Sequence, residues 1–159
     1  MRGKWLLAGF MALLALVGCS DSVQDDLLHY VNDEMPALAE EETEIINLYD
    51  SVIGPNHQDD SITHQTLITE VIPQYVGYID RVQKVKVETS ELRELHENYI
   101  DALHLQHSAF LGVVSAIEHQ DYGEMDAANA KLQEAGKMMR DYQEDVNVLA
   151  EEHGVELTK

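Results

Sequence analysis

The sequence predicts an all-α fold, an antiparallel up-down-up-down four-helix bundle that follows a cleaved signal peptide. Apolar residues recur every three or four positions in four long segments, which is the period of one helix face. Glycine and proline are scarce, with nine and three residues in a chain of 159. No stretch alternates apolar and polar residues as a half-buried strand would. Short connections between long helices favour antiparallel neighbours.

The first helix is expected over residues 23–52. Asp21 and Ser22 precede it, and both are good N-cap residues because their side-chain oxygens accept hydrogen bonds from the first turn. An acidic run over residues 40–42 interrupts the apolar stripe. The following loop, residues 53–60, contains Gly54 and Pro55 and ends the helix.

Three further helices follow the loop. Ser61 is expected to cap the second, whose stripe runs from Leu67 to Val85. Residues 88–90 form a short connection, and Ser90 caps the third helix, whose stripe covers residues 92–117. A turn over residues 120–123 leads to the last helix, which ends at Gly154. Each helix would be about 40 Å long at 1.5 Å per residue.

Prolines and glycines also occur inside the helical patterns. Pro36 either kinks the first helix or is the first residue of a fresh helix after a break. Pro73 lies at a similar height in the second helix, so the two helices are candidates to kink together. Gly77, Gly112 and Gly136 each cost about 1 kcal/mol against alanine. Close approach of a neighbouring helix would explain them.

The first nineteen residues have the layout of an export signal. Arg2 and Lys4 precede an apolar run over residues 5–17, which is too short to cross a bilayer core of ~30 Å. The run ends in Leu16-Val17-Gly18-Cys19, which resembles the lipobox of bacterial lipoproteins. The resemblance implies that residues 1–18 are removed and that diacylglycerol is joined to Cys19. Two acyl chains supply stable anchoring, at about 0.8 kcal/mol per buried CH₂.

The same resemblance places residues 19–159, a single helical domain, on the extracytoplasmic face of the cell membrane. The whole chain has thirty acidic and ten basic residues, a formal charge of -20. Loss of Arg2 and Lys4 leaves eight basic residues and a charge of -22. This charge argues against nucleic acid as a partner and is compatible with loose binding of a divalent cation. Cys19 is the one cysteine, which excludes an internal disulfide.

Eight histidines raise the question of a metal site. A di-metal carboxylate site in a bundle needs Glu-x-x-His on two helices, and the sequence has no such motif. Asp26-x-x-His29 and Asp101-x-x-His104 have the spacing with the shorter acid. We expect His104 on the outer face of the third helix. His104 and His107 are three residues apart, but a surface pair without a third ligand is a weak site.

The bundle topology also gathers histidines at its two ends. The membrane-proximal group consists of His29, His96 and His153. The far group consists of His57, His64 and His119, together with Asp59, Asp60 and Asp121. One hypothesis is a transition-metal site or a sensor of pH near 6. The other interpretation is that exposed helix ends simply tolerate histidine.

Other chemistry finds no pattern in the sequence. There is no motif for haem attachment, a phosphate loop, a nucleophile elbow or a calcium hand. We therefore assign no catalytic residue, no cofactor site and no metal site. Three short segments are similar to small helical lipoproteins of Bacillus-type Gram-positive bacteria, namely residues 47–52, 71–73 and 139–143.

Together these features predict a non-enzymatic, membrane-anchored module at the cell envelope. It would act through contacts with an envelope protein or as an accessory subunit. A metal-binding or pH-sensing envelope protein is the alternative function. Convergence of three or more His, Asp or Glu side chains would favour that alternative, and an exposed apolar patch or groove between helices would favour the interaction module.

Overall fold

The computed structural model describes residues 21–157, which are helical apart from short connections and contain no strand. The all-α fold class is therefore confirmed. The helices are α1 (Ser22–His29), α2 (Met35–Asp50), α3 (Asp60–Thr66), α4 (Ile72–Val82), α5 (Ser90–His119) and α6 (Tyr122–Glu152). A π-helical segment joins α1 to α2, and a second one joins α3 to α4. These two continuous stretches and α5 and α6 are the four helices that the sequence predicts.

The two π-helical segments lie immediately before the prolines of the first two helical stretches. Tyr30–Glu34 precedes α2, and Leu67–Val71 precedes α4, and each helix has its proline at one of its first two positions. Proline lacks an N–H and its ring clashes with the carbonyl four residues earlier. A π-turn widens the helix at that point. The α-helical segment α2 thus begins at Met35, with Pro36 as its second residue, and it follows the π-helical segment without a break.

Aspartates cap three of the helices. Asp21 precedes α1, Asp59 precedes α3 and Asp121 precedes α6, and the side chain of each accepts hydrogen bonds from backbone N–H groups of the first turn. The predictions for two other caps were wrong. The N-cap of α3 is Asp59 and not Ser61, and the N-cap of α5 is Thr89 and not Ser90. In both places the helix begins one or two residues earlier than predicted.

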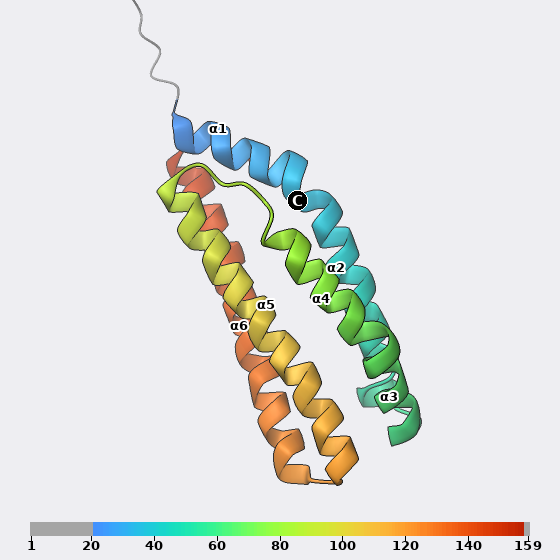
Figure 1. Ribbon diagram of the computed structural model, residues 1–159. Coiled ribbons are helices and arrows are strands. Elements are labelled where there is room, and N and C mark those ends of the chain that lie inside the picture. The colour runs from blue at the N-terminus through green and yellow to red at the C-terminus, as the bar shows by residue number, and fades with distance from the viewer. Residues whose placement is uncertain (1–20, 158–159) are drawn as a thin grey trace, which may run out of the picture.

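The helices pack as neighbouring pairs. Figure 1 shows α5 and α6 side by side and running in opposite directions, and α6 makes most of its contacts with α5. The stretch from α3 to α4 runs back along α2 (Figure 1). Helix α1 lies across the end of the molecule where α6 finishes. The loop after α2 and the turn before α6 lie at the opposite end.

Close approach explains one of the three helical glycines. A Cβ placed on Gly112 of α5 would lie 3.1 Å from the Cβ of Ala128 on α6, which is tighter than ordinary contact. The same test at Gly77 and Gly136 meets the flexible ends of Arg81 and Arg140 at 3.5 Å. A side chain at position 112 would therefore press on α6, whereas one at position 77 or 136 would make only ordinary contact.

The interior divides into two apolar clusters. The larger one lies among α2, the α3–α4 stretch and α5, and its largest fully buried side chains include Tyr75, Tyr78 and Phe110. The smaller one joins α1 to α5 and to the last turns of α6 through Leu27, Leu92 and other residues. Burial of α1 against this second cluster fixes it across the end of the molecule.

A buried carboxylate fastens α1 to the connection before α5. Asp26 is 8% exposed, and its Oδ2 accepts hydrogen bonds from the N–H of Glu88 at 3.0 Å and the N–H of Thr89 at 2.8 Å. The Thr89 hydroxyl donates to the same oxygen at 2.6 Å. The connection is longer than predicted, because α4 ends at Val82 and Val85 lies outside the helix.

Replacement of Asp26 by alanine should lower the free energy of unfolding by about 2–3 kcal/mol, because two backbone N–H groups and a hydroxyl lose their acceptor. Chemical denaturation of the domain measures this loss. The matched control is Asp25→Ala, at the exposed neighbouring position, which should change stability by less than about 0.5 kcal/mol. Equal losses in the two variants would contradict the role given to Asp26.

Candidate functional site

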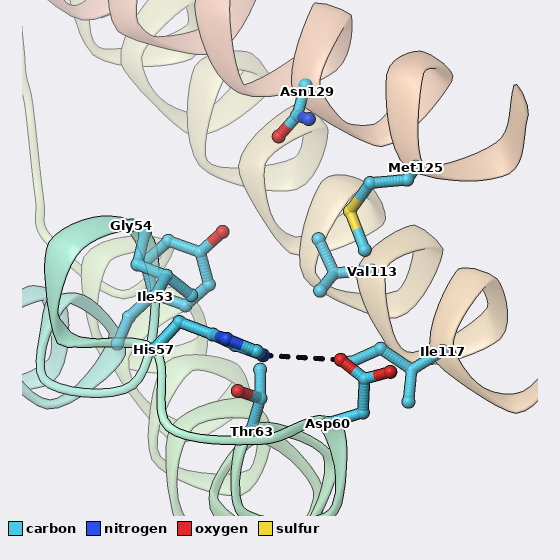
Figure 2. A pocket seen from close by; sticks show the side chains of 10 residues that line it. Ile53, Gly54, His57, Asp60, Thr63, Val113, Ile117, Met125 and Asn129 are labelled. Atoms are coloured by element: carbon cyan, nitrogen blue, oxygen red, sulfur yellow. Dashed lines mark hydrogen bonds and ion pairs between the residues drawn. The ribbon is translucent and has the colours of Figure 1, made fainter. Parts of the chain in front are cut away.

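A pocket of about 480 Å³ opens at the end of the molecule opposite α1. Figure 2 shows its walls, with the loop after α2 on one side and α5 and α6 on the other. It has the size of a small-molecule site. Its lining residues are Tyr49, Ile53, Gly54, His57, Asp60, Thr63, Val113, Ile117, Met125 and Asn129.

The loop wall is held in place by turn chemistry. Gly54 has φ +53°, a left-handed conformation that glycine adopts without strain. The Asn56 side-chain amide donates to the carbonyl of Asp50 at 2.9 Å. The Thr63 hydroxyl donates to the carbonyl of Val52 at 2.8 Å, which ties α3 to the end of α2. These bonds fix the loop wall on the neighbouring helices.

The inner wall of the pocket is apolar and partly aromatic. Tyr49 and Val113 belong to the buried core, and Ile117 and Met125 pack against it while they line the pocket. The Tyr49 ring lies 4.7 Å from the Phe110 ring, centroid to centroid. Burial, with a smaller effect from the adjacent carboxylate, raises the pKa of Tyr49 to about 12. Tyr49 is therefore a neutral hydroxyl at physiological pH.

The rim of the pocket carries its polar groups. His57 and Asp60 point toward one another in Figure 2, with Nε2 of the imidazole 3.2 Å from Oδ1 of the carboxylate. A carboxylate only accepts, so Nε2–H is the donor in this contact. Asn129 lies on the α6 side and is exposed. A second hollow of about 370 Å³ continues past Asp60 toward Asp121 and Tyr122.

The far-end histidines do not form the predicted cluster. His57 pairs with Asp60, His64 pairs with Glu118 at 2.8 Å, and His119 pairs with Glu124 at 3.1 Å. Each histidine thus has its own carboxylate. Across residues 21–157, no three His, Cys, Asp or Glu side chains converge as a metal site would require.

The three histidines predicted to lie near the membrane, His29, His96 and His153, are also separate. His29 pairs with Asp33 at 2.8 Å, and His153 pairs with Asp21 at 2.6 Å. His96 is buried in the core, at 4% exposure. These three residues share an end of the molecule and do not share a ligand.

The pair His104 and His107 does not form a surface site. His104 is exposed, as predicted, and its Nε2 lies 3.0 Å from the side-chain amide of Gln83. The Nε2 atom of His107 is instead buried and has no hydrogen-bond partner among the described residues. Burial lowers the pKa of His107, with a further contribution from His104.

A directed chain of hydrogen bonds runs through the core. Nε2 of His96 lies 3.1 Å from the Val82 carbonyl, which only accepts, so this nitrogen carries the proton. Nδ1 then accepts from the Tyr30 hydroxyl at 3.0 Å, and the Tyr30 oxygen accepts from Tyr142 at 2.8 Å. Burial lowers the pKa of His96. The imidazole is therefore held neutral in one tautomer.

A second buried chain ends on a carboxylate. The Tyr99 hydroxyl donates to Glu42 at 2.9 Å, so its oxygen accepts from the Tyr78 hydroxyl at 2.5 Å. The rings of Tyr99 and Tyr142 stack at 4.6 Å, which brings the two chains together. Burial raises the pKa of Glu42, and the hydrogen bond from Tyr99 opposes this effect without cancelling it.

Sequence reasoning missed the pocket. Tyr49, Val113 and Met125 belong to apolar stripes, and nothing in a stripe distinguishes a core position from one that lines a cavity. The available signal was the loop at Gly54 and Pro55, which separates α2 from α3 and leaves room beside α5 and α6. Cys19 and the signal segment lie outside the described residues.

Comparison with known proteins does not suggest a function for this chain, so the function is assigned from the geometry of the site. No protein-family model, no curated protein and no solved structure matches the chain. Among the described helices, α5 is long and apolar enough to cross a membrane by length and composition, with 33% of its apolar window buried. A core helix satisfies the same criteria, and α5 contributes Tyr99, Leu103 and Phe110 to the core.

Replacement of Glu42 by glutamine should stabilise the fold near neutral pH. Because the pKa of Glu42 is raised in the fold above 4.5, the stability it contributes is complete below pH 4.5 and is lost as pH rises through the folded-state pKa. Glutamine keeps an oxygen acceptor for Tyr99 and removes the charge. The advantage over the parent protein should shrink as pH falls toward 4.5, as measured by melting temperature across a pH series.

Glu44→Gln is the control for this experiment, because Glu44 is exposed on the same helix. Its melting temperature should follow that of the parent protein at every pH. A Glu42→Gln variant that tracks the parent protein in the same way would show that the carboxyl is not strained by burial.

Proposed function

We propose that this chain is a membrane-anchored extracytoplasmic lipoprotein and that its helical domain is a non-enzymatic binding module. Residues 1–18 are the signal peptide, and lipid on Cys19 is the anchor. Residues 19–159 form one antiparallel up-down-up-down four-helix bundle. The module acts at the cell envelope through the pocket at its far end, with a small ligand or the side chains of an envelope protein as its occupant.

The position of Asp21 supports this orientation. Ser20 alone separates Asp21 from Cys19, and Asp21 is already fixed by its hydrogen bond to His153 at the end of α6. The Gln24 side chain also donates to the carbonyl of His153 at 2.8 Å. A lipid on Cys19 would therefore hold the α1 end of the molecule near the membrane. The pocket is lined by residues of the loop after α2 and of α5 and α6 near the turn that joins them. These segments lie at the other end of the molecule (Figure 1).

The pocket is the observation that carries the proposal. Its inner surface is mainly carbon, contributed by Tyr49, Val113, Ile117 and Met125, and its polar groups stand at the rim. This composition is typical of a binding site, where apolar contacts supply affinity and a few polar groups fix orientation. The geometry favours this function over metal binding, because no metal-ligand cluster forms within residues 21–157.

Cys19→Ala should release the protein from membranes or leave an uncleaved precursor, because the lipid supplies nearly all of the attachment of so acidic a domain. Cell fractionation followed by mass measurement of the chain tests this. Ser20→Ala is the control and should leave processing and attachment unchanged. Normal cleavage after Gly18 together with unchanged membrane retention in Cys19→Ala would overturn the anchor.

A photo-crosslinking amino acid at Asn129 should capture the occupant of the pocket in intact cells. The control places the same group at Asn147, which is exposed on the same helix outside the pocket. Met125→Trp should fill the pocket and abolish the Asn129 adduct, while the melting temperature stays near that of the parent protein. Equal adducts at Asn129 and Asn147, or an adduct that persists in Met125→Trp, would refute the assignment of function to the pocket.

A further inference from the structure

One polar group inside the pocket has no protein partner. Tyr49 is 6% exposed and lines the cavity. Its hydroxyl makes no hydrogen bond to any of residues 21–157, and no hydrogen bond contributes to its raised pKa. The hydroxyl oxygen is not a fully buried atom, so it remains accessible to a hydrogen-bond partner from outside the protein. By contrast, the hydroxyls of Tyr75, Tyr78 and Tyr99 each have a hydrogen-bond partner within the protein. Tyr49 therefore offers the pocket a hydroxyl that no protein group occupies.

The charge around the pocket has one sign. Asp60 stands at the rim, and Asp121 lines the adjoining hollow. Among the described residues, neither hollow is lined by lysine or arginine. The nearby acids Glu118 and Glu124 pair with histidines, not with fixed cations. With a formal charge of -20 on the chain, the potential at the pocket attracts cations and repels anions.

We propose that the pocket binds a small organic cation with an apolar body, of the class of protonated aryl-alkyl or alkyl amines. This inference rests on the proposed function, because it names the ligand class for the same pocket. The apolar body lies against Val113, Ile117 and Met125. The ammonium group donates to the carboxylate of Asp60 and to the hydroxyl oxygen of Tyr49.

An ammonium fits these groups better than other polar heads do. A carboxylate or phosphate on the ligand would face Asp60 and be repelled. An alcohol could bond to Tyr49 but would gain no attraction from Asp60. An ammonium gains both the hydrogen bond to Tyr49 and the attraction to Asp60. Because Asp60 is exposed at the rim, its ion pair contributes only about 0.2–1 kcal/mol. This corresponds to a preference of about two- to fivefold over a neutral ligand, before the field of the whole chain is added.

The test uses three probes that share one body and differ in the charge of the head. They are 4-phenylbutylamine, 4-phenylbutanol and 4-phenylbutyrate, each titrated by calorimetry into the domain that begins at residue 20. The expected order of affinity is amine, then alcohol, then carboxylate, with about a fivefold step or more between the first two. Added salt should weaken amine binding and leave alcohol binding nearly unchanged.

Two variants test whether the amine binds in the pocket. Asp60→Asn should weaken amine binding about two- to fivefold and leave alcohol binding unchanged, and Asp101→Asn is the control because Asp101 is exposed on α5 outside the pocket. Tyr49→Phe should weaken both the amine and the alcohol, because both use the hydroxyl. Asp60 follows the capping residue Asp59, so its replacement does not remove the helix cap.

The outcomes separate this inference from the proposed function. Equal affinity for the amine and the alcohol, unchanged amine binding in Asp60→Asn, or no binding of the amine at millimolar concentration would each overturn the ligand class. The proposed function would survive those results if the Asn129 crosslink remained specific to the pocket. Loss of that specificity would instead remove the pocket as the functional site.

Discussion

The contact between Gly112 and Ala128 lets α5 and α6 pack closely, because there is almost no room for a Cβ at position 112. These are the two longest helices, and the other elements are placed by packing against them. Helix α1 lies across one end of this helix pair, where Leu27 packs into the smaller apolar cluster. The stretch from α3 to α4 packs on α5 through the larger cluster. The α5–α6 pair thus provides the rigid side of the molecule, and one wall of the pocket.

The polar groups in the core follow from the same arrangement. Two chains of hydrogen bonds, through Tyr30 and His96 and through Tyr99 and Glu42, cross the space between α5 and its neighbours. Each hydroxyl in these two chains has a hydrogen-bond partner, which compensates for its burial. The Val82 carbonyl fixes the donor direction in the first chain, and the Glu42 carboxylate fixes it in the second. Tyr49 differs because it lines the pocket and its hydroxyl belongs to neither chain.

The sequence was sufficient to predict four helical stretches because their apolar stripes are long and regular. It was less informative about where they end. Val85 continues the stripe of the second helix, but the chain leaves the helix after Val82, and Asp26 from a distant segment binds the connection at Glu88 and Thr89. A local pattern contains no information on such a contact. The spacing of apolar residues likewise does not predict the π-helical turns that precede the two prolines.

Site prediction failed for a different reason. Helix directions suggested which histidines share an end, but the chain has thirty acidic residues. Five of the eight histidines have a carboxylate of their own, namely His29, His57, His64, His119 and His153. His64 pairs with Glu118 across two helices, and His119 pairs with Glu124 across a turn. For several histidines to bind one metal ion, each would first have to break the contact with its own carboxylate. The abundance of acids therefore gives most of the histidines separate partners in the fold.

The acidic charge and the short connection to Cys19 have a joint consequence for how the module would work. Helix α6 has 31 residues and so extends about 45 Å between the α1 end of the molecule and the end that carries the pocket. With lipid on Cys19, the domain would be repelled by anionic headgroups yet held at one end, which favours an upright orientation. The pocket would then face away from the membrane. A cation drawn toward the acidic surface would meet the pocket before it reached the lipid.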